Sequence, residues 1–463
     1  MYIIWLVETF RVFSFHLQGY IFKANGWIHS YHIESEVIYM ENKIIVGIDV
    51  AKEFSYYSII TPNGKQYGKP FKAHNTLEGL EKVSKKLKEV EKELNVPCVL
   101  VMESTGHYSS ILFHFFHNSN FEVCIVNPIQ TNSIKNIKVR KVKNDKVDAY
   151  RIAILYKLGE IKPTKPPKKE IHQLNILCRQ YIKLVDDCTM YKNNLISLID
   201  QVYPEYNTAF SNITSKASLY ILENYPSAEK LLNADKDTLI TILATLSRKS
   251  LKWAKTKYNA LIDVAKSALK IGCAPKSSEI VIKSAITILK TLIKQKSMIE
   301  KEIKAIAKNI EEIKLLTTIP GIGIISAAIF ISEIRDFNNF KNARKLVAFC
   351  GIDPAVVESG KFKGNKVKMS KRGSGYLRRV LFMIALASIR KNRNSQYVNP
   401  ILYNYYSIKI KSKPKKVALV AIMHKIVNYI FAVLRDKKPF RIITPEEHNK
   451  SYRQSKLKLT LVS

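Results

Sequence analysis

The stretch that most constrains the fold is the apolar run KIIVGIDV at residues 43–50. A run without polar alternation is typical of a strand that is buried on both faces of its sheet. Further along, FSYYSII and KQYGKPFKA flank Asn63-Gly64, a dipeptide that favours a tight hairpin turn. Helix-like runs at 76–95 and 107–118 then alternate with the apolar runs PCVLVME and FEVCIVNP. The pattern predicts an α/β domain that ends near residue 160.

The rest of the chain has helical periodicity. A Pro- and Lys-rich linker leads into a helical region, and a helical, basic region with Gly-containing turns follows. Five isoleucines alternate spacings of four and three, a coiled-coil-like seam that fits a hairpin within one chain or a dimer contact: Ile299, Ile303, Ile306, Ile310 and Ile313. We expect five segments: an extension at 1–39, the α/β domain at 40–160, linker and helical region at 161–314, a C-terminal domain at 315–445 and a basic tail at 446–463.

Residues 1–39 do not have the sequence pattern of a membrane span or of a cleaved leader. The stretch is rich in aromatic residues, but Glu8, Arg11 and His16 interrupt it, and Met40 opens MENKIIVGIDVAKE like a natural start. The six cysteines are scattered without a CxxC pair, which argues against zinc and against a disulfide framework. We therefore expect a cytoplasmic protein.

The balance of charge indicates a polyanionic partner. The chain has 75 Lys and Arg against 38 Asp and Glu, a formal net charge of +37. Residues 340–463 alone hold 28 Lys and Arg against 5 Asp and Glu. Such a surplus favours nucleic acid, because each phosphate that is neutralised releases condensed counterions. A membrane surface would require a basic amphipathic helix or a lipidation signal, and the sequence has neither.

Four acidic residues fall at comparable places in the α/β domain. Asp49 lies inside the apolar run KIIVGIDV, and Glu103 ends the apolar run PCVLVME. Asp145 and Asp148 open the helix that is expected after the last strand. Asp148 is in line with Ile152 and should point inward. The helix dipole alone would also favour acids in this first turn. Together, however, these carboxylates offer hard oxygen ligands for one or two Mg²⁺ (or Mn²⁺) ions, which can assist phosphodiester displacement.

The motifs VGIDVAKE, MESTGHY, VNPIQT and VRKVKNDKVDAYRIA resemble the N-terminal domain of the DEDD-type insertion-sequence transposases. These are the bridge-RNA-guided serine recombinases, a family that also includes the Piv-type DNA invertases. The resemblance implies a RuvC-like domain on a ribonuclease H fold, followed by a long helical middle and a mostly helical, basic C-terminal transposase domain. It also implies that Asp49, Glu103, Asp145 and Asp148 are the metal-binding acids.

The C-terminal sequence extends this resemblance. The hydroxyl of a serine in a turn among cations could attack a phosphate, and on chemistry alone this fits Ser359, Ser370 and Ser374. The resemblance of GIDPAVVESGKFKG to the family's segment assigns the nucleophile to Ser359. Pro320-Gly321-Ile322-Gly323 looks like a helix-hairpin-helix turn, in which glycines allow close approach to a phosphate, although a simple interhelical turn also fits. We expect nucleic-acid contacts from Arg140, Lys141, Lys143, Gly321, Gly323, Lys361, Lys363, Lys366, Lys371, Arg372, Arg378 and Arg379.

The function that the resemblance implies is DNA transposition through a covalent serine–DNA intermediate. The implied partners are element-end and target DNA, a structured guide RNA, and further copies of the chain in a dimer or tetramer that acts on nucleoid DNA. Base pairing would then carry the specificity, while the protein reads backbone and shape. Two alternatives remain open: a junction-type nuclease that directs water with the same acids, and a non-catalytic nucleic-acid-binding regulator. VGIDVA also resembles the phosphate loop of actin-like ATPases, but the glycine-rich nucleotide loops are not found further on.

Overall fold

The computed structural model describes residues 42–104, 108–126, 131, 145–158, 163–272, 277–355, 358–359, 362–363 and 368–442. The chain divides into two compact units, one up to Thr164 and one from Lys165 onward. The expected extension at 1–39 and the expected tail at 446–463 lie outside the described residues.

The first unit is built on one five-stranded sheet in the order β3-β2-β1-β4-β5. The hairpin strands are antiparallel to their neighbours, whereas β4 and β5 run parallel to β1. The expected hairpin turn joins β2 to β3, where Gly64 has a φ of +81° that favours glycine. The predicted mixed α/β domain is confirmed, with strands at Ile44–Val50 (β1), Phe54–Ile60 (β2), Gln66–His74 (β3), Cys98–Glu103 (β4) and Glu122–Val126 (β5).

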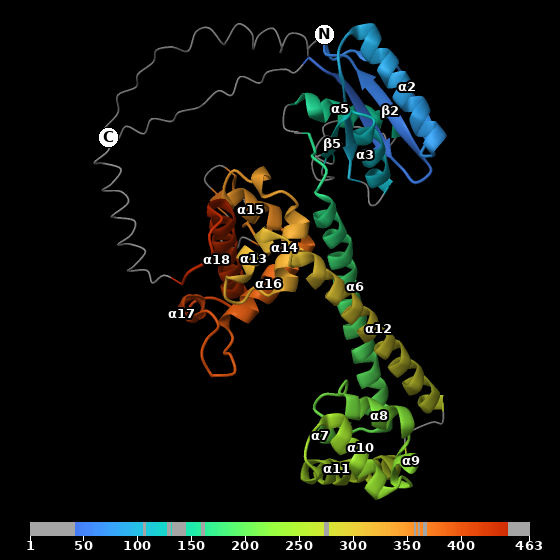
Figure 1. The fold of residues 1–463 in the computed structure, drawn as a ribbon, viewed down its shortest axis with the longest axis vertical. Coiled ribbons are helices and arrows are strands. Elements are labelled where there is room, and N and C mark those ends of the chain that lie inside the picture. Colours follow the sequence, from blue (N-terminus) through green and yellow to red (C-terminus); the bar gives the residue numbers. More distant parts are fainter. Residues whose placement is uncertain are drawn as a thin grey trace, which may run out of the picture. The chain divides into compact units, whose positions relative to one another are not determined.

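Helices cover both faces of this sheet, as the unbroken apolar character of β1 requires. One face packs against α2 (Leu77–Leu94) and α3 (Tyr108–Asn118), and alternate β1 residues such as Val46 enter that core. The other face packs against α5 (Asp145–Lys157), where Ile45 of β1 shares a core with Ile152. Figure 1 shows α2 and α5 on opposite sides of the strands.

The second unit is entirely helical apart from one short hairpin and isolated bridges, as far as its described residues go. Two long helices, α6 (Lys169–Val202) and α12 (Ser277–Ala307), pack side by side (Figure 1). The C-terminal end of α6 and the N-terminal end of α12 share a core with five shorter helices: α7 (Tyr206–Ala209), α8 (Lys216–Asn224), α9 (Ala228–Leu232), α10 (Lys236–Ser247) and α11 (Leu251–Ile271).

The N-terminal end of α6 and the C-terminal end of α12 are part of a larger C-terminal core. Among the described residues, one helix, α18 (Lys415–Asp436), is long and apolar enough to cross a membrane, but half of its most apolar window is buried in the structure. Since its residues belong to this core, its apolar character is explained by packing. The other C-terminal elements are α13 (Glu311–Thr317), α14 (Ile324–Ile334), the 3₁₀ turn η1 (Phe337–Asn339), α15 (Ala343–Cys350), α16 (Gly375–Ile389), α17 (Pro400–Lys409) and α18 itself (Lys415–Asp436).

The isoleucine seam packs within the chain, but it is not one continuous helix. Ile303 and Ile313 are buried in the C-terminal core, and the other three seam residues pack against that core. However, α12 ends at Ala307 and α13 begins at Glu311, with Ile310 at its N-cap. The seam therefore spans two helices, and packing within one chain, one of its two expected uses, agrees with the structure.

Candidate functional site

The first two acids take neighbouring positions on adjacent parallel strands. Ile48 of β1 pairs with Met102 of β4, so Asp49 and Glu103 each follow at the next position. Strand residues alternate between faces, and the residues two before them, Gly47 and Val101, lie on the α5 face. Asp49 and Glu103 therefore share that face, at the carboxyl end of the two strands.

Helix α5 brings the remaining acids to the same end of the sheet. The backbone of α5 lies directly on β1, since a Cβ on Gly47 would overlap the Ala149 carbonyl oxygen and approach Ala153 Cβ to 2.9 Å. At the other end of α5, Lys157 Nζ contacts Gly64 in the β2–β3 turn, beside the start of β1. The helix therefore runs antiparallel to β1. Its first turns, with Asp145 and Asp148, point toward the end of β1 that carries Asp49.

Two of these acids accept side-chain hydrogen bonds from neighbouring residues. Asp148 is buried, with 6% of its surface exposed, as its spacing from Ile152 predicted, and its Oδ1 accepts a hydrogen bond of 2.8 Å from Arg151 Nη1. Glu103 Oε2 accepts a hydrogen bond of 2.8 Å from Thr131 Oγ1. Asp145 is the first residue of α5, but its side chain lies outside the described part of the structure.

The donor set fits a hard divalent cation, because carboxylate oxygens are the ligands that Mg²⁺ and Mn²⁺ prefer. Among the side chains that the structure describes, however, no three His, Cys, Asp or Glu groups are close enough together to hold one ion. The side chain of the fourth acid, Asp145, is not among these described side chains. The sheet and α5 place Asp49, Glu103 and Asp148 at one end of a shared face.

Arg151 and Thr131 were not among the residues that sequence reasoning selected. The spacing of Arg151, three residues after Asp148 on the same helix, is a detectable signal for an ion pair. The contact between Thr131 and Glu103 joins residues 28 positions apart, and nothing in the local pattern indicates it. Gly47 was missed for the same reason, because its contact with α5 exists only in the folded domain.

In the second unit, Ser359 lies in a short hairpin between α15 and α16. Strands β6 (Glu358–Ser359) and β7 (Phe362–Lys363) are antiparallel, with Ser359 opposite Phe362. The hairpin's base is tied together where Ala355 N donates to the Lys368 carbonyl oxygen at 2.8 Å. The Ser359 side chain is outside the described residues. Its role as nucleophile stays a prediction.

The two competing serines have structural partners. Ser370 Oγ donates to Asp353 Oδ1 at 2.6 Å, across the base of the hairpin. Ser374 is the N-cap of α16, where its Oγ accepts from Leu377 N and donates to Glu333 Oε2 at 3.1 Å. Ser374 therefore has a structural role at the start of α16, and Ser370 has one at the base of the hairpin.

The expected phosphate-gripping cations fall into three groups. Lys371 and Arg372 are exposed in the loop before α16. Arg378 donates to the carbonyl oxygens of Lys371 and Gly373, and Arg379 pairs with Asp186 Oδ2 at 2.6 Å. The remaining side chains lie outside the described part of the chain: Arg140, Lys141, Lys143, Lys361, Lys363 and Lys366.

The PGIG turn connects α13 to α14, as the sequence indicated. Gly321 has a φ of +104°, and a Cβ there would collide with Ser388 of α16. Gly323 is the N-cap of α14, and a Cβ there would meet nothing within 4 Å. Gly321 is therefore needed for packing, and Gly323 has the open space that approach of a phosphate would require.

The comparisons with known proteins match these same segments. A family model for transposases of the DEDD IS110 type matches residues 46–204, which contain all four acids. A second model, described as the transposase IS116/IS110/IS902 family, matches residues 313–399, which contain the PGIG turn and Ser359. The chain belongs to the IS110 family of transposases. Both matching models describe transposases.

Individual relatives share modest identity with this family member. An insertion element IS110 protein of 43.6 kDa from Streptomyces coelicolor is 22% identical over 267 residues, which are 57% of this chain. The match spans 63% of that relative, less than two thirds of its length. The pilin gene-inverting protein of Moraxella bovis is 30% identical over 126 residues, 27% of this chain and 38% of that protein. Thermus thermophilus RuvC in complex with a Holliday junction substrate aligns with 26% of the chain and 99% of RuvC, at 9% identity and a TM-score of 0.21, too low to support an argument.

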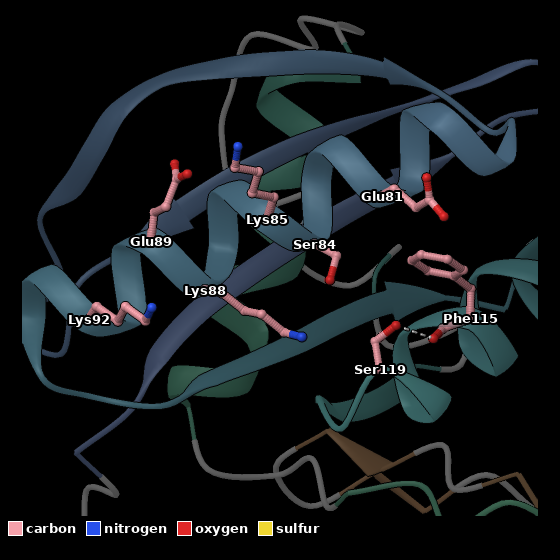
Figure 2. Close-up of a pocket in the computed structure, with 8 residues that line it drawn as sticks. All are labelled: Glu81, Ser84, Lys85, Lys88, Glu89, Lys92, Phe115 and Ser119. Atoms are coloured by element: carbon pink, nitrogen blue, oxygen red, sulfur yellow. Dashed lines mark hydrogen bonds between the residues drawn. The ribbon is translucent and has the colours of Figure 1, made fainter.

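A groove of about 490 Å³ lies between α2 and α3, apart from the acids (Figure 2). Lys85, Lys88 and Lys92 of α2 line it together with Glu81 and Glu89 of the same helix. Because α2 and α3 cover the sheet face opposite α5, this groove is not the acidic site. Its mixed charges also give it no clear preference for an anion or a cation.

Proposed function

We propose that the chain excises and inserts its mobile element by metal-assisted cleavage of phosphodiester bonds and strand exchange through a covalent serine–DNA intermediate. The observation that carries the proposal is the placement of Asp49, Glu103 and the start of α5 at one end of one sheet face. These acids lie inside the segment that matches the DEDD-type family model. A sheet end with several carboxylates has little structural value by itself, since like charges repel.

The N-terminal unit would be the metal-bearing catalytic domain, with a ribonuclease H-like, RuvC-like fold. Its hairpin strands followed by alternating strands and helices in one mixed sheet support this assignment. Asp49, Glu103, Asp145 and Asp148 would hold Mg²⁺ or Mn²⁺. Such ions, when bound, would neutralise charge on a reacting phosphate.

The C-terminal domain, residues 315–445, would supply the nucleophile. The Ser359 hydroxyl attacks phosphorus, a new O–P bond forms, and the scissile P–O bond breaks as its deoxyribose oxygen takes up a proton. The bond energy is kept in the phosphoserine ester, so a DNA hydroxyl can reverse the step on a new strand. The exposed cations of the loop before α16, Lys371 and Arg372, would hold the backbone near this hairpin.

The proposed partners are DNA, a guide RNA and further copies of the chain. A net charge of +37 fits binding to both nucleic acids, and a guide would explain recognition by a protein that reads backbone and shape. A dimer or tetramer would bring several hairpins to one DNA junction. These proteins would act on the nucleoid DNA in the cytoplasm of a prokaryotic cell.

The direct test is to trap protein–DNA adducts on a denaturing gel. The full chain would be mixed with Mg²⁺ and DNA that carries the element's junction and target, with and without RNA transcribed from the gene's flanks. We expect a denaturation-resistant adduct that requires Mg²⁺ and increases with the RNA. Cleavage without any adduct would indicate a nuclease that directs water, and binding without cleavage would indicate a regulator.

A further inference from the structure

A buried carboxylate joins three elements of the second unit. The side chain of Glu333, at the end of α14, is only 6% exposed, and four donors surround it. From α6, Arg179 Nε and Nη2 donate to its two oxygens at 2.7 and 3.3 Å, and Asn175 Nδ2 donates at 3.0 Å. The fourth donor is Ser374 Oγ, at the N-cap of α16. Glu333 thus fixes the guanidinium of Arg179 beside the first turn of α16.

Arg179 is only partly used by this contact. Its side chain remains 47% exposed, and its guanidinium lies 4.9 Å from the centroid of the Tyr376 ring, in the first turn of α16. The fork toward Glu333 uses Nε and Nη2, which leaves Nη1 for another acceptor. An arginine held by a carboxylate and an aromatic ring is prepared for an anionic ligand, because little rotamer entropy remains to be lost.

Arg335, two residues after Glu333, has an unusual backbone. Its φ is +61° and its ψ is −72°, and Asp336 N donates to the Ile334 carbonyl oxygen at 2.8 Å across it. This is a γ-turn with positive φ, the strained form that L residues rarely adopt and glycine tolerates. Strain at a non-glycine residue is expected where the side chain has a use, since glycine would form the same turn more easily.

The two arginines give this place a surplus of positive charge. Arg179 and Arg335 stand near one carboxylate, Glu333, and the pKa of Arg335 lies below its usual value because its guanidinium is partly removed from water and Arg179 is close. Within the described residues, no hydrogen bond or ion pair involves the Arg335 side chain, which remains accessible to solvent. The N-terminal end of α16 adds its own positive dipole.

We infer that Arg179, which Glu333 holds at the start of α16, and Arg335, two residues after Glu333, form a binding site for one backbone phosphate of a nucleic acid strand. A phosphodiester carries one negative charge, which would balance the net single positive charge of the two arginines and Glu333. Lys371 and Arg372 lie in the loop just before α16. The inference rests on the proposed function in that its ligand is nucleic acid. The site would anchor a strand at the N-cap of α16, four residues after Ser370, which lies at the base of the Ser359 hairpin.

The test uses Arg335→Gly, which removes the side chain and the backbone strain together. Binding of a fluorescein-labelled DNA duplex and of a labelled RNA to the full chain would be followed by anisotropy across a salt series. We expect affinity to fall about tenfold for the nucleic acid that uses the site, with the salt slope reduced by about one. The melting temperature should stay equal or rise, a combination that misfolding cannot produce.

The matched control is Arg248→Gly. Arg248 is another exposed arginine at positive φ, 57°, at the C-cap of α10, so its replacement changes charge and backbone in the same way. Its affinity for nucleic acid should match wild type. If Arg335→Gly binds DNA and RNA like Arg248→Gly, the phosphate site is wrong although the proposed function stands. If the wild-type chain binds neither, the proposed function fails as well.

Discussion

Ser359→Ala is expected to abolish the covalent protein–DNA adduct, lowering its yield at least about a thousandfold, because no other group can replace the nucleophile. DNA affinity should be unchanged, since the substitution removes no charge. The short β6–β7 hairpin should also persist, because backbone pairing of Ser359 with Phe362 does not depend on the hydroxyl. The measurement is the denaturing gel, with anisotropy on the same DNA.

The matched control for this substitution is Ser370→Ala. Ser370 Oγ spans the base of the hairpin through its 2.6 Å hydrogen bond to Asp353, so its loss should cost about 1 kcal/mol of stability. The adduct should still form. An adduct that survives in Ser359→Ala and disappears in Ser370→Ala would move the nucleophile to Ser370 and contradict the assignment.

Gly47→Ala is expected to detach α5 from the sheet. A single Cβ at Gly47 would overlap the Ala149 carbonyl oxygen, a backbone atom in the middle of α5 that no rotamer change can move. Overpacking of this kind costs about 3 kcal/mol or more. Displacement of α5 would also carry Asp148 away from Asp49, so cleavage should be lost even where the chain remains folded.

Hydrogen exchange measured by mass spectrometry separates these effects. Peptides from α5 and β1 should lose protection in Gly47→Ala, while peptides from the second unit should keep theirs. Gly68→Ala is the control, because a Cβ at Gly68 would meet nothing within 4 Å and only its φ of +65° opposes substitution. Its cost should be about 1 kcal/mol. Unchanged α5 protection in Gly47→Ala would show that α5 does not rest on β1 as described.

Local sequence patterns predict much of the first unit. The unbroken run in β1, the Asn-Gly turn and the inward orientation of Asp148 all follow from periodicity and turn chemistry, and the structure confirms them. The convergence of Asp49 and Glu103 follows only in part. Strand direction and register are needed to place both on one face, and the local pattern does not determine them.

Contacts over long sequence separations explain what the sequence alone missed. The break in the isoleucine seam around Ile310 has neither Gly nor Pro to signal it. Arg379 was expected to bind phosphate, but it pairs with Asp186, a residue 193 positions earlier, and its role in nucleic-acid binding stays a prediction. Likewise, the cluster around Glu333 joins residues that are 41 to 158 positions apart.

The central claim is that carboxylates from β1, β4 and α5 form one metal-dependent catalytic site. The most direct test is Mg²⁺-dependent cleavage of junction DNA by Asp49→Asn beside Glu53→Gln, which changes an exposed acid just after the same strand. We expect cleavage by Asp49→Asn to fall at least about a thousandfold, since a ligand of the metal is lost. Glu53→Gln should cleave like wild type. Full cleavage by Asp49→Asn, or wild-type cleavage that continues in EDTA, would contradict the account.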